Sequence, residues 1–185
     1  MSRHAQVVRL TEPVSERDHR AGPSDAPVTL LEYGDYECPY CGRAFPIVQE
    51  VRRRLGKRLQ FVFRNFPLSQ SHPHAERAAE VAEAAAAQGQ FWPMHDRLFQ
   101  RQVALDDEAL IERARELRLD VERVRRELAD GTHRPRVQED VSSGIRSGVN
   151  GTPTFYINGV RHDGDYAIAT LLAAIARAGA AEALT

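Results

Sequence analysis

The sequence is short of cysteine, of long apolar runs and of any excess of charge of one sign. Two cysteines occur in 185 residues, and the net charge is −1 at neutral pH. Such a balance creates no overall field for nucleic acid or for an anionic membrane surface, so we expect neither as a partner. No apolar run approaches the roughly 20 residues of a membrane-spanning helix. Residues 1–10 also lack an apolar core of signal-peptide length, so we expect a cytoplasmic protein.

The composition is that of an ordinary folded chain. A length of 185 residues suits one domain, or one domain that carries an inserted subdomain, and can bury a core without disulfide staples. Hydrophobic residues make up 42% and charged residues 28%, which is typical of globular domains. Arginine far outnumbers lysine and is interspersed with glutamate and aspartate, a pattern typical of solvated helix faces.

The two cysteines stand three positions apart, as Cys38 and Cys41, where an apolar run gives way to a helical pattern. In a reducing compartment such a pair is more often catalytic, redox-sensing or metal-binding than structural. A disulfide at this spacing would close too short a loop to add much stability. The carboxylates of Asp35 and Glu37 flank the thiols. They would oppose thiolate formation at Cys38 if they lay close to it, but we interpret them as solvating the loop.

The chain around the cysteines has the pattern of a βαβ unit. Residues 28–33 predict a buried strand, apolar positions from 44 to 55 recur at helical spacing, and residues 59–66 predict a second strand. Strand, helix and strand within about 40 residues indicate two parallel strands joined by a right-handed crossover. Pro46 falls inside the helix and should kink it.

The middle of the chain predicts helices only. Residues 67–148 contain a series of amphipathic helices, with Asp106 and Asp120 as N-caps and Gly131 beyond a helix end. A hairpin with an Asn-Gly turn and a last helix follow. We therefore predict an α/β domain formed by 28–66 and 149–180, an inserted helical subdomain over 67–148, and an N-terminal arm or linker over 1–27, in which 7–10 are suited to an edge strand.

The position of the thiols suggests different roles for them. Cys38 opens a helix, where unpaired backbone N–H groups and the positive end of the dipole favour a thiolate. Pro39 at the first helical position costs no hydrogen bond. Cys41, one turn later, should be more buried and suited to resolving a mixed disulfide. We predict Cys38 as the nucleophile and Cys41 as the resolving thiol.

Two other classes of function remain open on the residues alone. Zinc also binds Cys-x-x-Cys pairs, but structural zinc needs two further ligands, and no second cysteine pair exists. A metal-binding module would have to use Cys38, Cys41 and His72 or His74. The third alternative is a peptide-binding scaffold whose thiols are incidental.

Two motifs together resemble a known family. The segment Cys38-Pro39-Tyr40-Cys41, followed much later by Gly151-Thr-Pro-Thr-Phe155 at the start of a hairpin, resembles the thioredoxin superfamily. The helical stretch between the two halves, and the block 32–41, are similar to its DsbA-like branch. Over about residues 28–178 this resemblance implies a thioredoxin-like α/β fold, with βαβ and ββα halves and an all-helical insertion. It also implies a thiol–disulfide oxidoreductase that needs neither cofactor nor metal.

The resemblance also implies roles for single residues. Pro153 would be a cis-proline facing Cys38, and Thr152 would offer backbone contacts to a bound peptide. Glu32 matches a buried acid that assists proton transfer near Cys41. The partners implied are protein, peptide or small-thiol substrates and a redox recycling partner, either a thiol pool or a reductase. The residues implied to contact substrate are Pro39, Tyr40, Thr152 and Pro153.

The branch and the direction of electron flow stay open. The Pro-Tyr dipeptide between the thiols is also that of glutaredoxins, so a glutathione-dependent reductase is an alternative. The familiar DsbA oxidases are periplasmic, whereas this sequence shows no export signal. We therefore expect a cytoplasmic relative that acts as an oxidoreductase, an isomerase or a thiol-repair enzyme. The reduction potential depends on how far the reduced form is stabilised, which the sequence does not specify.

Overall fold

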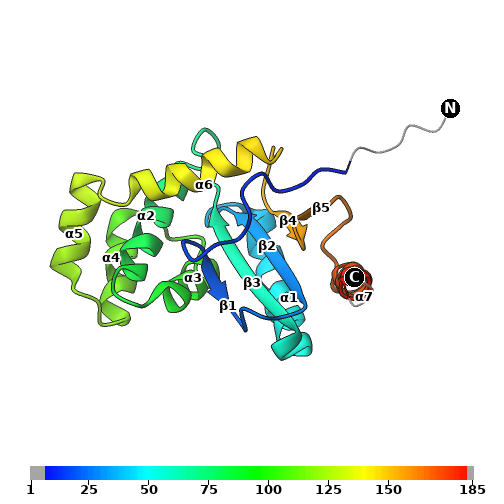
Figure 1. Cartoon of the computed structure of the whole chain (residues 1–185). Coiled ribbons are helices and arrows are strands. Elements are labelled where there is room, and N and C mark those ends of the chain that lie inside the picture. Colours follow the sequence, from blue (N-terminus) through cyan, green and yellow to red (C-terminus); the bar gives the residue numbers. More distant parts are fainter. Residues whose placement is uncertain (1–6, 183–185) are drawn as a thin grey trace.

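A computed structural model describes residues 7–182 and builds them around one five-stranded sheet (Figure 1). The strand order is β1-β3-β2-β4-β5. At its centre β2 and β3 run parallel, while the outer pairs β1–β3, β2–β4 and β4–β5 are antiparallel. The strands are β1 (His19–Ala21), β2 (Val28–Gly34), β3 (Leu59–Asn65), β4 (Thr154–Ile157) and β5 (Val160–His162).

The predicted βαβ unit is present. Helix α1 (Pro39–Leu55) joins β2 to β3, and the two strands pair in parallel with Leu30 opposite Phe61. Both strands are buried almost throughout, as their apolar composition predicts. Pro46 lies inside α1 as expected. The helix ends at Gly56, whose positive φ of 52° suits glycine, and a short 3-10 turn η1 (Gly56–Arg58) leads into β3.

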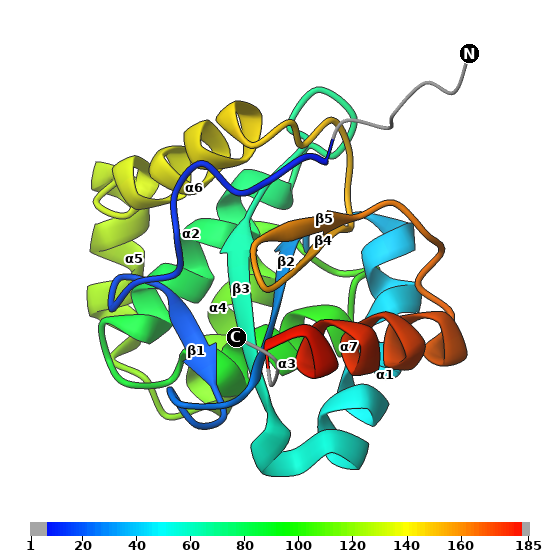
Figure 2. The ribbon, with the colours of Figure 1, turned by 45° about the vertical axis from the view of Figure 1, so that its right-hand side comes forward.

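The second half of the fold is a hairpin followed by a helix. Asn158 and Gly159 both have positive φ at the turn between β4 and β5, the conformation that an Asn-Gly hairpin turn requires. Helix α7 (Ile168–Glu182) then packs beside α1, with Leu171 and Ile175 in the same apolar core (Figure 2). This βαβ-plus-ββα arrangement confirms the predicted thioredoxin-like fold.

The stretch between β3 and β4 is helical, as predicted. The side chains of Asp106 and Asp120 accept N–H groups at the starts of two of its helices, and Gly131 ends one in the left-handed conformation. The helices are α2 (Ala75–Ala86), α3 (Phe91–Gln100), α4 (Asp107–Glu116), α5 (Val121–Asp130) and α6 (Arg134–Arg146).

The helical insertion shares its core with the sheet. Met94 and Leu98 of α3 belong to the same buried cluster as Val48 of α1 and Phe63 of β3. Helix α3 also packs on α1 directly, since the rings of Phe99 and Phe45 stack with centroids 5.2 Å apart. The insertion therefore buries its apolar face against the α/β part and is not a separately packed domain.

The N-terminal segment differs from the expectation. Residues 7–10 make an isolated bridge between Arg9 and Val160 where a strand was expected, and the edge strand is β1, which the sequence did not predict. An arm or linker is therefore too simple a description of residues 7–27, while residues 1–6 lie outside the described part. Strand β1 has only three residues, too few for a strand to be predicted from the sequence, so its pairing with β3 is a tertiary effect.

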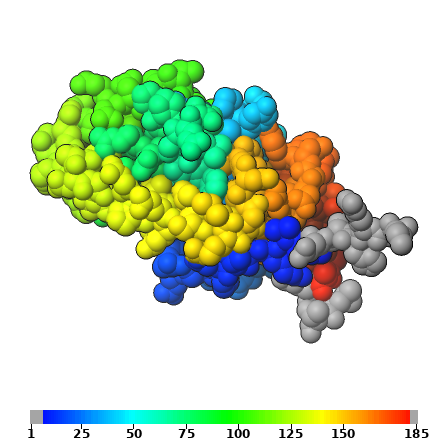
Figure 3. Space-filling view, turned by 90° about the horizontal axis from the view of Figure 1, so that it is seen from above, coloured from blue at the N-terminus to red at the C-terminus, as the bar shows by residue number. Residues whose placement is uncertain are grey.

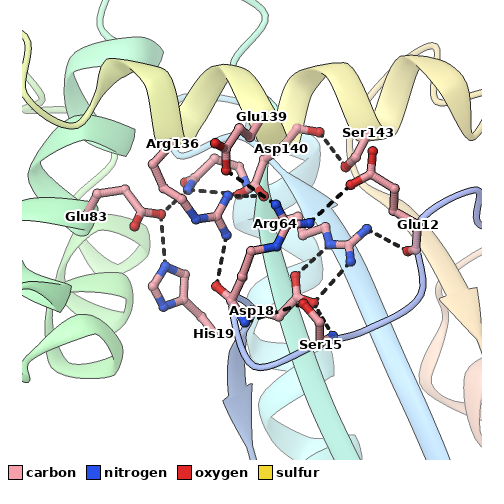
Figure 4. A network of polar contacts seen from close by, with 12 residues as sticks. Glu12, Ser15, Asp18, His19, Arg64, Glu83, Arg136, Glu139, Asp140 and Ser143 are labelled. Atoms are coloured by element: carbon pink, nitrogen blue, oxygen red, sulfur yellow. Dashed lines mark hydrogen bonds and ion pairs between the residues drawn. The ribbon is translucent and has the colours of Figure 1, made fainter.

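A buried ion pair fastens this segment across β3 (Figure 4). The Arg64 guanidinium donates to both carboxylate oxygens of Asp18, at 2.7 and 3.1 Å, and both side chains are 3% exposed. Arg64 also donates to the Tyr33 hydroxyl and to the Glu12 carbonyl. Figure 3 shows the N-terminal segment (blue) running along α6 (yellow), where Thr11 and Ser147 form hydrogen bonds.

No helix within residues 7–182 combines the length and the apolar character that crossing a membrane requires.

Candidate active site

The two cysteines lie where β2 ends and α1 begins. Cys38 is the N-cap residue of α1, with an extended backbone, and Pro39 occupies the first turn. Cys41 follows one turn later. Both are free thiols, and they are 2% and 0% exposed, respectively. The N-terminal end of α1 therefore points its unpaired N–H groups at the Cys38 sulfur.

The surroundings of Cys38 favour its thiolate. A hydrogen bond from the Cys41 thiol, against the opposing effect of burial, lowers the pKa of Cys38 to about 5, with help from Thr152 and from the backbone N–H groups of Cys41 and Tyr40. In the thiol form, the Cys38 Sγ donates to the Thr152 carbonyl oxygen at 3.4 Å. At neutral pH Cys38 is therefore mostly a thiolate.

Cys41 has the opposite character. Burial, the hydrogen bond to Cys38 and the negative charges of Glu32 and Cys38 raise the pKa of Cys41 well above its usual range. The backbone N–H of Asp35 donates to the Cys41 Sγ at 3.4 Å. The pair therefore combines an ionised sulfur at the helix start with a protonated sulfur beneath it.

Glu32 lies beneath the thiols on β2, opposite Phe155 of β4. Its side chain is only 3% exposed, and burial, followed by the charge of Cys38, raises the pKa of Glu32 to about 8. A carboxyl group with that pKa can release and take up a proton near neutral pH. Its charge acts on Cys41, which brings together the two residues that the resemblance linked.

The loop before β4 faces Cys38. The Thr152–Pro153 peptide bond is cis, and the loop is held by a bond from the Thr154 hydroxyl to the Gly151 carbonyl. Cys38 and Thr152 stand 114 positions apart in sequence and meet here. Thr152 and Pro153 are half-buried, so part of this loop is accessible beside the sulfur.

Pro39 and Tyr40 lie at the surface beside Cys38. The Tyr40 side chain is 57% exposed, and the guanidinium of Arg43 stands 4.4 Å from its ring centroid. Such cation–π contacts hold an exposed ring in place without burying it. The substrate-contact residues implied by the resemblance thus form one accessible rim around a buried sulfur.

Asp35 is a constituent of the site that was misread from the sequence. Its side chain is buried rather than solvating a loop, because one oxygen accepts the N–H groups of Glu37 and Cys38, at 2.7 and 3.2 Å. Its other oxygen accepts the N–H of Leu68 and contacts His72. A polar residue three positions before an N-cap cysteine was the available signal, since short acidic side chains often bond nearby backbone N–H groups.

Gln102 is a second residue that the sequence did not reveal. It follows α3, and its Nε2 donates to the carbonyls of Tyr36 and Cys38, at 2.9 and 3.0 Å. The amide passes so close to Gly42 that a Cβ there would lie 1.9 Å from its oxygen. No local pattern predicts a contact across more than 60 positions, because it depends on how α3 packs against α1.

The structure assembles no metal-binding group within residues 7–182, where no three His, Cys, Asp or Glu side chains gather suitably. His72 points its Nδ1 at Asp35 at 2.7 Å, and the exposed His74 donates its backbone N–H to Glu37.

Comparison with known proteins adds a family and several relatives. The thioredoxin family model matches residues 14–177. The sodium/proton antiporter NhaA 1 of Salinispora arenicola is 47% identical over 173 residues, which cover 93% of this chain and 26% of the antiporter. The chain thus spans about a quarter of the length of the curated relatives it matches.

Solved structures share the fold. Oxidised BdbD from Bacillus subtilis superposes with a TM-score of 0.83 at 22% identity, covering 94% of this chain and 98% of BdbD. A thioredoxin-like oxidoreductase from Silicibacter pomeroyi superposes with a TM-score of 0.79 at 27% identity, covering 89% of this chain and 93% of that one. The catalytic domain of Proteus mirabilis ScsC and Wolbachia pipientis α-DsbA1 have the same fold, with TM-scores of 0.75 and 0.80 at 20% identity. They cover 90% and 95% of this chain, and the predicted thioredoxin-like fold is confirmed.

Proposed function

Because this chain belongs to the thioredoxin family, we propose that it is a thiol–disulfide oxidoreductase that works through Cys38 and Cys41. The observation that supports this most directly is the contrast between the two sulfurs. One is held near pKa 5 at the start of a helix, and the other is kept protonated beneath it. An attacking thiolate and a protected resolving thiol are what disulfide exchange needs.

The proposed reaction runs in two exchanges. The Cys38 thiolate attacks one sulfur of a substrate disulfide, forming a Cys38–substrate disulfide and releasing the other substrate sulfur as a thiolate that takes up a proton. Cys41 then gives its proton to the Glu32 carboxylate and attacks Cys38. This closes the Cys38–Cys41 disulfide and releases the second substrate sulfur as a thiolate, which takes up a proton from water. Two electrons pass from the protein dithiol to the substrate, and the reverse sequence oxidises a substrate dithiol.

The rim of the site supports peptide or protein thiols as substrates. Pro39 and Tyr40 are exposed beside Cys38, and the loop of Thr152 and Pro153 offers an accessible backbone on the other side. A thiol pool or a reductase would restore the starting redox state. We place this activity in the cytoplasm, where glutathione is available as a recycling thiol. The net direction of electron flow is set by the reduction potential of the Cys38–Cys41 pair relative to glutathione.

The test is to trap the mixed disulfide. In Cys41→Ser, attack by Cys38 is expected to stop at a covalent substrate adduct that reducing agents release, visible by mass spectrometry of the intact protein. Cys38→Ser is the matched control and should form no such adduct, because the remaining thiol is buried and protonated. Absence of an adduct in Cys41→Ser, together with no oxidation or reduction of test proteins by the wild type, would reject the proposal.

The relatives suggest a second, compatible role. Since this chain aligns with about a quarter of proteins named as sodium/proton antiporters, we infer that it serves as a redox module associated with such a transporter. Membranes that contain an antiporter of this type should then retain the purified chain. The Cys41→Ser variant should be retained on them through a disulfide. Equal retention by membranes that lack the antiporter would contradict this role.

A further inference from the structure

We propose that His72 is a positioning residue of the thiol pair: with Asp35 it forms a charge-balanced pair that holds the Cys38 loop and favours the Cys38 thiolate. The pair is formed across the chain, because Asp35 follows β2 and His72 lies in the loop between β3 and α2. The inference rests on the proposed function, in which Cys38 is the attacking sulfur.

Asp35 is the point at which the contacts of this region converge. Through its carboxylate and its own backbone N–H it contacts both cysteines: Oδ1 accepts the Cys38 N–H, and the Asp35 N–H donates to the Cys41 sulfur. Its Oδ2 accepts the N–H of Leu68 at 2.8 Å and contacts His72 Nδ1 at 2.7 Å. The carboxylate therefore ties the loop after β3 to the start of α1.

His72 can neutralise the negative charge of the Asp35 carboxylate beside Cys38. The Asp35 side chain is fully buried, and a lone carboxylate there would oppose a second negative charge on the adjacent Cys38 sulfur. The His72 side chain is 18% exposed, so its ring can carry a proton while it contacts Asp35. A protonated His72 makes the pair neutral overall, which removes the repulsion and leaves the helix start free to favour the thiolate.

The remaining charges around His72 act in the same direction. Burial opposes protonation, but the Asp35 bond and the charges of Asp35, Cys38 and Glu37 together raise the pKa of His72. Glu37 is the other acidic group facing this loop, and it accepts the backbone N–H of His74. The Cys38 thiolate thus stabilises the protonated His72 ring, and the protonated ring in turn favours the thiolate.

The variant that separates charge from shape is His72→Asn. The asparagine amide can still donate to Asp35 from nearly the position of Nδ1, but it carries no charge. In the reduced protein we expect the midpoint of the Cys38 thiolate absorbance titration to rise by about one unit, which is about tenfold less thiolate at a pH below the midpoint. The equilibrium with glutathione should shift by up to tenfold toward the oxidised protein, or about 30 mV in potential.

Three companion variants complete the test. His74→Asn is the matched control, because His74 is exposed and its ring has no hydrogen bond within the described residues. The Cys38 thiolate titration of this variant should match that of the wild type. Asp35→Asn keeps the Oδ1 acceptor and removes the charge, so adding His72→Asn to it should produce no further shift. His72→Lys restores a cation and should return the midpoint toward that of the wild type, which keeps the test decisive even if Asp35→Asn does not fold.

A wild-type titration in His72→Asn would overturn the proposal, and so would a shift that persists unchanged in the Asp35→Asn background. Neither outcome bears on whether Cys38 exchanges disulfides, because the titration uses no substrate. Conversely, a failure to trap any adduct in Cys41→Ser would reject the oxidoreductase function while leaving the His72 result to stand.

Discussion

At the scale of single residues, the site depends on groups whose ionisation is displaced by their surroundings. Glu32 is buried among the strands and its pKa is about 8, whereas Cys38 nearby has a pKa of about 5. The two shifts have different origins, burial for the carboxyl and hydrogen bonds for the sulfur. A carboxyl group with a pKa of about 8 can take up and release a proton near neutral pH, as the proposed step at Cys41 requires.

Replacing Glu32 by Gln should stabilise the reduced protein and slow its resolving step. A folded-state pKa of about 8 against an ordinary 4.5 means that the folded protein holds a proton that the unfolded chain has lost, so the stability of the wild type falls as pH rises through this window. At about pH 8, Glu32→Gln should be more stable than wild type by a few kcal/mol, at about 1.4 kcal/mol for each pKa unit. Urea unfolding at about pH 5 and about pH 8 measures this.

The exposed Glu112→Gln is the control and should show no such pH-dependent difference. If Glu32→Gln loses stability with rising pH as steeply as the wild type, then Glu32 is not the group that titrates. Rapid-mixing kinetics should show release of the mixed disulfide slowed by roughly a hundredfold or more, the usual contribution of a general base.

At the scale of elements, the start of α1 is held from the helical insertion as well as from the sheet. Gln102, after α3, binds two carbonyls of the cysteine loop, while Asp35 binds the N–H groups of the same loop. Backbone carbonyls of the loop are thereby bonded from the helical insertion, and backbone N–H groups of the loop are bonded by Asp35 after β2. The thiols are thus positioned by contacts between elements far apart in the chain.

Replacing Gln102 by Ala should loosen this loop. The carbonyls of Tyr36 and Cys38 would both lose a donor, which should cost about 1–3 kcal/mol of unfolding free energy, and amide hydrogen exchange at residues 36–41 should become faster. Gln100→Ala, on the exposed end of α3, is the matched control and should change neither. Identical exchange in the two variants would show that the Gln102 contacts do not hold the loop.

At the scale of the whole molecule, the N-terminal segment is bound to the α/β core by the buried Asp18–Arg64 pair. Around this pair, His19 contacts Glu83 of the insertion (Figure 4), and Glu83 and Asp140 also bond Asn65 of β3, so that segment, sheet and insertion meet in one polar network. Buried charges of this kind stabilise only while each keeps its partner. The network therefore adds polar links between parts of the chain that also meet in shared apolar clusters.

Replacing Asp18 by Asn should destabilise the protein by about 3–5 kcal/mol at neutral pH, because Arg64 is left buried without its counter-charge. Although burial opposes it, the bond to Arg64 lowers the pKa of Asp18 below its ordinary 3.8, so this contribution is present above that pH and is lost as pH falls through the folded-state pKa. Denaturant unfolding should show a gap from wild type that is constant near neutral pH and closes below about pH 4.

The exposed Asp25→Asn controls for the loss of one negative charge and should leave stability nearly unchanged. An Asp18→Asn protein as stable as this control would mean that the buried pair does not fasten the N-terminal segment.

Local patterns in the sequence are enough to place the main elements and to suggest exchange chemistry at the thiols. Apolar periodicity placed β2, α1 and β3, Asp106 and Asp120 marked helix starts, and the spacing of Cys38 and Cys41 pointed to exchange chemistry. These features are readable because they depend on neighbours within a few positions, where backbone geometry is fixed.

Which distant residues surround the thiols, and how each of them ionises, depends on the tertiary structure. The contacts of Cys38 with Thr152, of Asp35 with His72 and of Gln102 with the cysteine loop join positions 37 to 114 residues apart. Likewise β1 exists because β3 offers it an edge, and the pKa of Glu32 is raised to about 8 because the fold buries its side chain. Burial and long-range contact depend on packing of the whole chain, which no local pattern records.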